Sequence, residues 1–159
     1  MNNYKIVFMG TPDFGIPSLN ELYKQGYEVE AVYTQPDRVN KRGNKVQFSA
    51  VKQFALEHDI TIYQPNSLKD EKELDVLRAL NPDLIIVIAY GKILPQAVLD
   101  IPKYGVINVH ASLLPKYRGA APVQRSIIDG EETTGVTIMQ LDAGLAILLR
   151  KKAYLLLRI

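Results

Sequence analysis

Residues 84–89 read Leu-Ile-Ile-Val-Ile-Ala, and this short apolar stretch decides the class of fold. The triplet before it, Asn81-Pro82-Asp83, is typical of a turn and ends the preceding element. A strand that is apolar at every position, rather than at every second position, is typical of a strand buried on both faces. Such strands lie in parallel sheets that carry helices on both sides. The stretch therefore predicts a central strand of a parallel sheet.

The segments around this strand alternate between two periodicities. Short β-prone runs predict strands, and apolar residues three or four positions apart predict helices. The expected strands cover residues 4–9, 29–34, 60–63, 84–89, 106–109, 135–141 and 147–157. The expected helices cover residues 14–25, 50–58, 70–80, 95–99 and 122–129. This alternation favours right-handed βαβ units, so we expect an α/β, Rossmann-like fold with a mostly parallel sheet covered by helices on both faces.

Composition excludes several classes of protein. The chain has 159 residues, of which 47% are hydrophobic and 23% charged, as in an ordinary globular domain. Its apolar runs fall short of the ~20 residues that a bilayer span needs, and its first residues do not resemble a signal peptide. We therefore expect a cytoplasmic protein with no membrane partner. With no cysteine and two histidines, His58 and His110, we expect no metal site.

Open parallel sheets bind ligands beyond the carboxyl ends of their strands, so the segments that follow the strands are the candidate sites. Residues 10–15 (GTPDFG) follow the first strand but have Pro12 where a dinucleotide-binding G-x-G-x-x-G needs its second glycine. This argues against the alternative of a dehydrogenase. Residues 35–47 are predicted to form a long polar loop, and residues 38–47 contain four basic residues and no acidic one. A solvated loop and a nucleic-acid contact both remain open for this segment.

Asn108 and His110 end the expected strand 106–109, and the alternation of a strand places them on the same side. An asparagine amide can donate a hydrogen bond to a developing oxyanion, and a histidine can supply a proton near neutral pH. A lone histidine at the end of a strand can also be purely structural. The loop that follows, 112–122, is bounded by proline and glycine. The combination predicts an acid and oxyanion site at this strand end.

The motifs together resemble the methionyl-tRNA formyltransferases. The similar segments are GTPDFG (10–15), TQPDR (34–38), VIAYGKILP (87–95), INVHASLLPKYRGAAPVQRSI (107–127) and ETTGVTIMQLDAGL (132–145). The similarity runs from about residue 4 to residue 145 without a gap. The block NVHASLLPKYRGAAP with GVTIMQ is specific for folate-dependent formyltransferases, and AAPVQR points to the branch that acts on tRNA.

The resemblance implies transfer of a formyl group from the co-substrate 10-formyltetrahydrofolate to the amino group of methionyl initiator tRNA, without a metal and by a monomer. It implies that Asn108 stabilises the formyl oxygen, and that His110 polarises the carbonyl and assists proton movement toward N10. The implied folate-binding residues are Ser112, Leu113, Leu114, Pro115, Ile88, Tyr90 and Leu94. The implied tRNA-binding residues are Lys41, Arg42 and Lys45.

The chain departs from the family after residues 142–145 (DAGL). The family continues with Asp-Thr-Gly-Asp and an apolar strand, whereas Leu145 is followed at once by Ala146 and the apolar run 147–149. The simplest alignment deletes three residues and puts Ala146 in place of an aspartate, the family's third catalytic residue. We therefore expect weak or no turnover.

We also expect residues 1–159 to be a single N-terminal formyltransferase catalytic domain, incomplete at its C-terminal end and without the family's C-terminal β-barrel. Two alternatives remain open. One is a catalytically dead remnant that still binds folate or tRNA. The other is a related folate-dependent formyltransferase that acts on another amine.

Overall fold

The computed structural model describes residues 4–39, 46–142 and the backbone of 146–150. The chain divides into two compact units, Met1–Val106 and Ile107–Ile159. Within the described ranges, every helix falls short of the length and apolar character that a membrane span requires.

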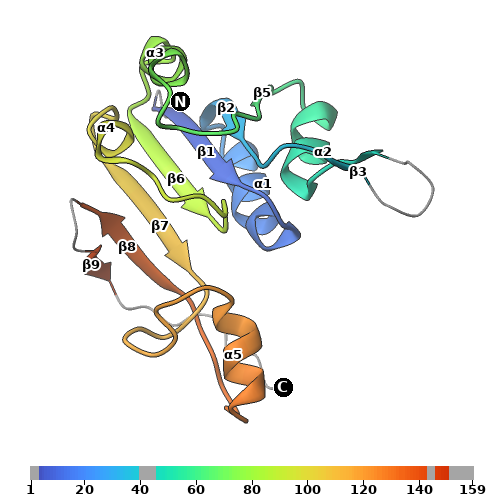
Figure 1. Cartoon of the computed structure of the whole chain (residues 1–159), viewed down its shortest axis with the longest axis vertical. Coiled ribbons are helices and arrows are strands. Elements are labelled where there is room, and N and C mark those ends of the chain that lie inside the picture. The colour runs from blue at the N-terminus through green and yellow to red at the C-terminus, as the bar shows by residue number, and fades with distance from the viewer. Residues whose placement is uncertain (1–3, 40–45, 143–145, 151–159) are drawn as a thin grey trace. The chain divides into compact units, whose positions relative to one another are not determined.

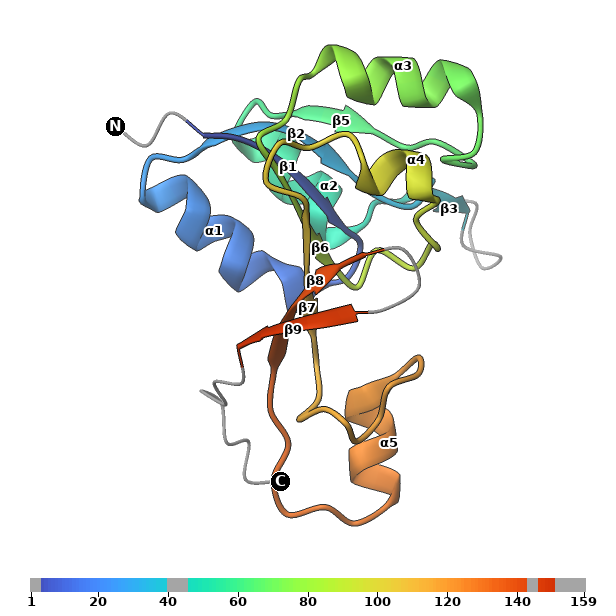
Figure 2. The same ribbon diagram turned by 90° about the vertical axis from the view of Figure 1, so that its left-hand side faces the viewer.

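The first unit is a parallel sheet with helices on both faces. Its strands are ordered β5-β2-β1-β6, and every adjacent pair is parallel. Helices α1 and α2 pack together on one face, and α3 and α4 on the other (Figures 1 and 2). The strands are β1 (Lys5–Gly10), β2 (Glu28–Tyr33), β5 (Thr61–Tyr63) and β6 (Leu84–Ile88). The helices are α1 (Ile16–Lys24), which follows the short 3-10 turn η1 (Asp13–Gly15), α2 (Ala50–Glu57), α3 (Glu71–Ala79) and α4 (Gln96–Leu99). The predicted α/β fold is confirmed.

Local sequence explains where these helices begin and end. Ser49 caps α2, because its hydroxyl accepts a hydrogen bond from the Lys52 amide over 3.0 Å. Asp70 caps α3 in the same way through the Lys72 amide, at 3.1 Å. Gly26 follows α1 with φ of +73°, a conformation that glycine adopts at little cost. The helices therefore begin and end within two residues of the expected positions.

The apolar run that predicts the central strand forms β6, and it pairs with β1 from Ile6↔Leu84 to Gly10↔Ile88. Ile85 and Ile88 are fully buried, as are Val7, Phe8 and Met9 of β1. Burial of these two strands forms the core of the first unit. It also fixes their carboxyl ends side by side.

The prediction that residues 35–47 form one continuous loop is wrong, because the segment contains two short strands. Two short strands, β3 (Arg38–Val39) and β4 (Val46–Gln47), pair antiparallel with Val39 opposite Val46. β-branched side chains favour this extended pairing. Lys41, Arg42 and Lys45 lie outside the described residues.

The second unit contains α5 (Pro122–Ile128) and three strands in the order β7-β8-β9. β7 (Val106–His110) starts at the boundary between the units, β8 covers Thr137–Leu141, and β9 covers Ala146–Arg150. β8 and β9 are antiparallel, with Leu141 opposite Ala146. The strand expected over 147–157 is thus described up to residue 150, and its remaining residues lie outside the described ranges.

Candidate active site

The carboxyl ends of β1, β2 and β6 are joined by hydrogen bonds to one carbonyl group. The hydroxyl of Thr11 and the side-chain amide of Gln35 both donate to the Tyr90 carbonyl, over 3.0 and 3.2 Å. The Gln35 backbone amide donates in turn to the Thr11 hydroxyl, at 3.3 Å. The polar residues that follow three different strands therefore meet at one edge of the sheet, as the parallel arrangement predicts.

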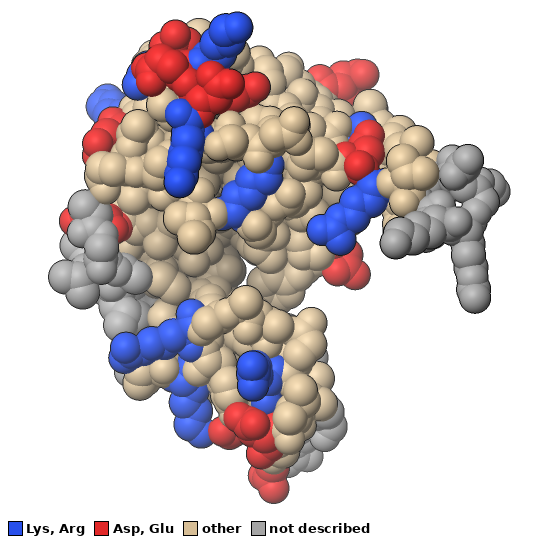
Figure 3. Space-filling view, viewed as in Figure 1, with Lys and Arg blue, Asp and Glu red and all other residues tan. Residues whose placement is uncertain are grey.

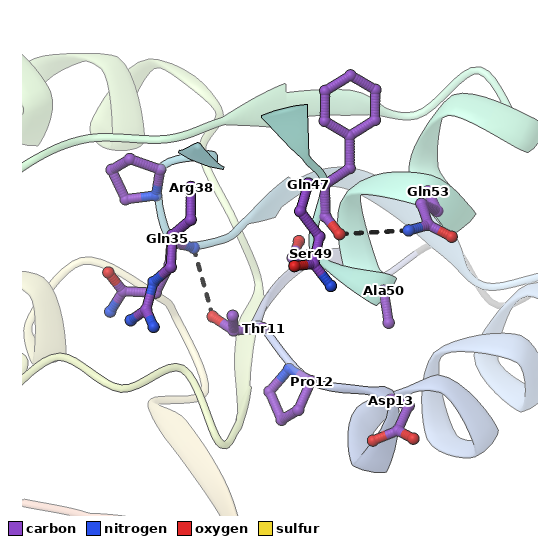
Figure 4. Close-up of a pocket in the computed structure, with 11 residues that line it drawn as sticks. Thr11, Pro12, Asp13, Gln35, Arg38, Gln47, Ser49, Ala50 and Gln53 are labelled. Atoms are coloured by element: carbon purple, nitrogen blue, oxygen red, sulfur yellow. Dashed lines mark hydrogen bonds between the residues drawn. The ribbon is translucent and has the colours of Figure 1, made fainter. Parts of the chain in front are cut away.

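A cavity of about 470 Å³ opens beside this edge (Figure 4). Gln35 and Arg38 lie on one side of it and Gln47 and Ser49 on the other, with Thr11 between them (Figure 4). The lining residues are Thr11, Pro12, Asp13, Gln35, Pro36, Arg38, Gln47, Phe48, Ser49, Ala50 and Gln53. The GTPDFG motif and the basic segment, both singled out in the sequence, contribute to it. The residues from the start of α2 carry no recognisable motif, and sequence reasoning misses them.

Three residues with an implied folate contact lie at the end of β6. Ile88 is fully buried and Tyr90 is 1% exposed, whereas Leu94 is half-buried. Burial raises the pKa of Tyr90 to about 12, which keeps its hydroxyl neutral. Because the side chains of Ile88 and Tyr90 fill the core, a contact from either residue to a ligand would come from its backbone.

The loop after β6 is held by Lys92. Its ammonium group donates to the carbonyls of Pro65 and of Asn66, the latter over 2.9 Å. Burial lowers the pKa of Lys92. Ile93, the next residue, is 92% exposed. The loop therefore presents an apolar side chain to solvent from an anchored backbone.

In the second unit, Asn108 and His110 close β7 and are both half-buried. They are two positions apart in the strand and therefore lie on the same side. The Nε2 atom of His110 lies 2.6 Å from the Tyr117 carbonyl oxygen. A carbonyl oxygen only accepts, so Nε2 must carry the hydrogen. In the neutral ring, Nδ1 is then the atom with the free electron pair.

The turn that follows β7 is fixed by two buried hydroxyls. Ser112 is fully buried, and its hydroxyl donates to the Lys116 carbonyl over 2.7 Å. Thr137 of β8 donates to the Ser112 carbonyl over 2.7 Å and accepts from the Leu114 amide over 3.1 Å. The Ser112 side chain is therefore used within the turn.

The rest of the segment with implied folate contacts is more accessible. Leu113 and Leu114 are half-buried, and Pro115 is exposed. Leu113 and Pro115 line a second cavity, of about 250 Å³, together with residues of the segment that leads into β8. This cavity lies entirely within the second unit.

Glu131 is a site residue that sequence reasoning misses. Its Oε1 atom accepts hydrogen bonds from the Lys116 ammonium over 2.7 Å and from the Tyr117 hydroxyl over 3.1 Å. These two hydrogen bonds hold the pKa of the Glu131 carboxyl below its usual value. The two partners, Tyr117 and Lys116, are 14 and 15 residues away in sequence, so no local sequence motif predicts these hydrogen bonds.

The other histidine, His58, packs against helix α2 and has a structural role. Its ring stacks on Phe54 with the centroids 4.0 Å apart, and its Nδ1 donates to the Phe54 carbonyl over 2.8 Å. Within the described residues, no group of three or more histidine, aspartate or glutamate side chains could hold a metal ion.

The sequence matches the family model described as formyl transferase over residues 4–153. The chain belongs to the formyl transferase family. A methionyl-tRNA formyltransferase from Clostridium perfringens is 61% identical over 142 residues, which cover 89% of this chain and 46% of that protein. A methionyl-tRNA formyltransferase from Legionella pneumophila is 54% identical over 145 residues, covering 91% of this chain and 46% of that protein. This formyltransferase chain thus spans about half the length of the curated relatives it matches.

Solved structures show the same fold. Phosphoribosylglycinamide formyltransferase from Streptococcus pneumoniae superposes with a TM-score of 0.69 at 20% identity, covering 92% of this chain and 79% of that one. At this identity the likeness concerns the fold alone. It confirms the Rossmann-like formyltransferase fold predicted from the sequence.

Proposed function

We propose that this formyltransferase transfers a formyl group from 10-formyltetrahydrofolate to the amino group of methionyl initiator tRNA. The observation that carries the proposal is the pair Asn108 and His110 at the end of β7, with the imidazole held at Nε2 by the Tyr117 carbonyl. High identity to proteins named methionyl-tRNA formyltransferase supports the choice of substrates.

The residues supply the two functions that the reaction needs. The amine attacks the formyl carbon, and the carbonyl oxygen becomes an oxyanion to which the Asn108 amide donates a hydrogen bond. His110 accepts the proton that the attacking nitrogen loses, on Nδ1, and delivers it to N10 as the bond from carbon to N10 breaks. Proton transfer of this kind contributes typically ~10²–10⁴-fold to a rate.

Folate binding is proposed for two segments of this chain. One is the backbone around Ile88, Tyr90 and Leu94 after β6, and the other is the turn that contains Leu113, Leu114 and Pro115 beside Ser112. The first is supported by its place after the carboxyl end of β6, where open parallel sheets bind their ligands. The second is supported by the apolar cavity wall that Leu113 and Pro115 form.

Contact with tRNA is proposed for the basic segment 38–47, which begins with β3 and ends with β4. On the face shown in Figure 3, acidic side chains gather over α3, while Lys and Arg are scattered in separate places. The acidic residues at the start of α3 include Glu71 and Glu73. A phosphate backbone would therefore be attracted to the basic segment of Arg38, Lys41, Arg42 and Lys45 rather than to α3.

We also infer that the protein is cytoplasmic and monomeric, that it uses no metal, and that residues 1–159 act as the N-terminal catalytic domain of the family's architecture. A measurement of the molecular mass in solution tests the inferred oligomeric state, since a dimer would contradict the inference of a monomer.

A second candidate function is folate and tRNA binding without turnover, and the β8–β9 hairpin favours it. Leu141 pairs with Ala146, so only residues 142–145 connect the two strands. In the proposed alignment, the first residue of β9, Ala146, stands where the family has its catalytic aspartate. Binding by the folate segments does not need that carboxylate, whereas proton transfer through His110 does.

Two measurements on the same preparation distinguish the candidates. Titration with 10-formyltetrahydrofolate should show binding, and a formyl-transfer assay on methionyl initiator tRNA should show little or no product. Inserting Asp-Thr-Gly-Asp between Leu145 and Ile147 in place of Ala146 should raise turnover and leave folate affinity nearly unchanged. His110→Ala should abolish that gain, and His58→Ala is the matched control. Full turnover by the unaltered chain would contradict the alignment and make Asp142 the first candidate for the acid.

A further inference from the structure

One carboxylate outside the proposed catalytic pair is connected to the turn that holds His110. Glu131 Oε1 accepts hydrogen bonds from both Lys116 and Tyr117, at 2.7 and 3.1 Å. The two donors belong to the turn after β7, whereas Glu131 lies beyond the end of α5. This oxygen atom therefore joins the far end of that turn to another segment of the second unit.

The backbone of Tyr117 needs such support. Its φ is +56°, in the left-handed region that side chains other than glycine disfavour. Residues in this conformation persist where the surrounding structure holds them in place. The Tyr117 carbonyl, in this strained position, is the group that accepts the hydrogen bond from His110 Nε2 over 2.6 Å.

We propose that Glu131 is a positioning residue for His110. By holding the side chains of Lys116 and Tyr117, it acts together with the Ser112 hydroxyl to fix the carbonyl that keeps the hydrogen on Nε2 and leaves Nδ1 as the basic nitrogen of the ring. The consequence for catalysis rests on the proposed function, but the orientation itself does not.

The remaining anchors of the turn make this role separable from folding. Thr137 holds the beginning of the turn without Glu131, because its hydroxyl donates to the Ser112 carbonyl and accepts from the Leu114 amide. At the end of the turn, the Ser112 hydroxyl donates to the carbonyls of Lys116 and Tyr117 over 2.7 and 3.4 Å, whereas Glu131 holds the side chains of the same two residues. Loss of the Glu131 carboxylate therefore removes two bonds at the end of the turn and leaves its beginning anchored. The hydrogen bond of His110 should weaken, while the hydrogen bond of the Leu114 amide to Thr137 should not.

The imidazole protons of the whole 159-residue chain provide the test, because the chain has only two histidines. In a ¹⁵N-labelled sample, His110 should show its proton on Nε2 and His58 on Nδ1, where it donates to Phe54. In Glu131→Ala, the His110 Nε2 proton should exchange with water roughly three- to tenfold faster, as expected for the loss of one hydrogen bond. Glu132→Ala, at the exposed neighbouring residue, should leave that exchange rate unchanged. Glu131→Gln, which keeps an acceptor for the Tyr117 hydroxyl, should restore part of the protection.

The amide of Leu114 serves as the folding reference. Faster exchange of the His110 proton alone supports the proposal. Equal acceleration at both sites would show a purely structural role and overturn it, as would an unchanged His110 signal. Should Glu131→Ala unfold the second unit, Tyr117→Phe decides, because it removes one of the two bonds and keeps the carbonyl. This readout needs no turnover, so failure of the proposed enzymatic activity would not be confused with failure of this proposal.

Discussion

Replacing Lys52 by methionine should lower the free energy of unfolding of the first unit by about 2 kcal/mol near neutral pH. Its Nζ atom lies 2.5 Å from Asp37 Oδ2 and 2.8 Å from Gln64 Oε1. The same atom lies 4.1 Å from the centroid of the Phe48 ring. Asp37 directly precedes β3 and Phe48 directly follows β4, so Lys52 contacts the residues on either side of the basic segment 38–47.

The magnitude follows from the environment of this ion pair. Hydrogen bonds to charged groups contribute ~1.5–3 kcal/mol each, whereas exposed ion pairs contribute ~0.2–1 kcal/mol. The side chains of Lys52 and Asp37 are 14% and 25% exposed, so the pair lies between these limits. Gln64 still donates to Asp37 over 2.8 Å in the variant, which keeps the carboxylate from being left unpaired.

The effect should depend on pH. Hydrogen bonding to Lys52, and then to Gln64, holds the pKa of Asp37 below its usual value. A carboxyl with a lowered pKa in the folded state stabilises the fold above its unfolded pKa of about 3.9, and this contribution is lost as the pH falls through the folded pKa. The difference between the wild type and Lys52→Met should therefore shrink as the pH falls from about 7 toward 3 and below.

Urea unfolding, followed by the near-UV circular dichroism of the buried tyrosines, measures this difference. Lys69→Met is the matched control, because Lys69 is exposed in the same unit. A loss below about 0.5 kcal/mol at neutral pH, or a loss that persists undiminished in acid, would refute the reasoning.

Three further variants have measurable outcomes. Tyr33→Phe should raise the free energy of unfolding by about 1 kcal/mol, because among the described residues the buried Tyr33 hydroxyl has no hydrogen-bond partner. Burial raises the Tyr33 pKa, so the wild type loses stability as the pH rises above about 10 and the variant should resist alkali better in thermal unfolding. Thr137→Val should cost about 2 kcal/mol in urea unfolding, since its buried hydroxyl bonds two backbone groups of the turn after β7. Gly135→Ala should weaken folate binding in titrations, because the added Cβ would lie 2.5 Å from Leu113 Cδ2, whereas Gly119→Ala has open space and should bind normally.

The strands and helices could be predicted from sequence because their signals are local. The apolar run that forms β6 and the cap residues Ser49 and Asp70 act within a few positions of themselves. The pairing of β3 with β4 could not be predicted from such local signals. It joins two-residue strands across a polar segment, and a pairing so short leaves almost no periodicity in the sequence.

The candidate site likewise has features that could be predicted from local sequence and features that could not. The position of His110 at the end of β7 follows from an apolar run that ends in polar residues. Its hydrogen bond to the Tyr117 carbonyl does not, because a backbone acceptor in a turn with positive φ has no signature in the residue types. Glu131 and Lys52 were missed for a related reason. Each forms its side-chain hydrogen bonds with residues at least 12 positions away, and a charged residue with such partners looks like any surface residue.

The Tyr117 carbonyl and the aspartate that the family resemblance implies would act on His110 in different ways. A carbonyl is neutral, so its hydrogen bond orients the ring and decides which nitrogen carries the hydrogen. A carboxylate does this as well, but hydrogen bonds to an ionised partner are roughly twice as strong and favour the charged ring. If the proposed alignment puts Ala146 in place of that aspartate, we expect the chain to keep the orientation of the imidazole and to lack the charge that would stabilise it once protonated. This difference predicts a site that holds its ligands in the correct geometry and fails at the proton-transfer step.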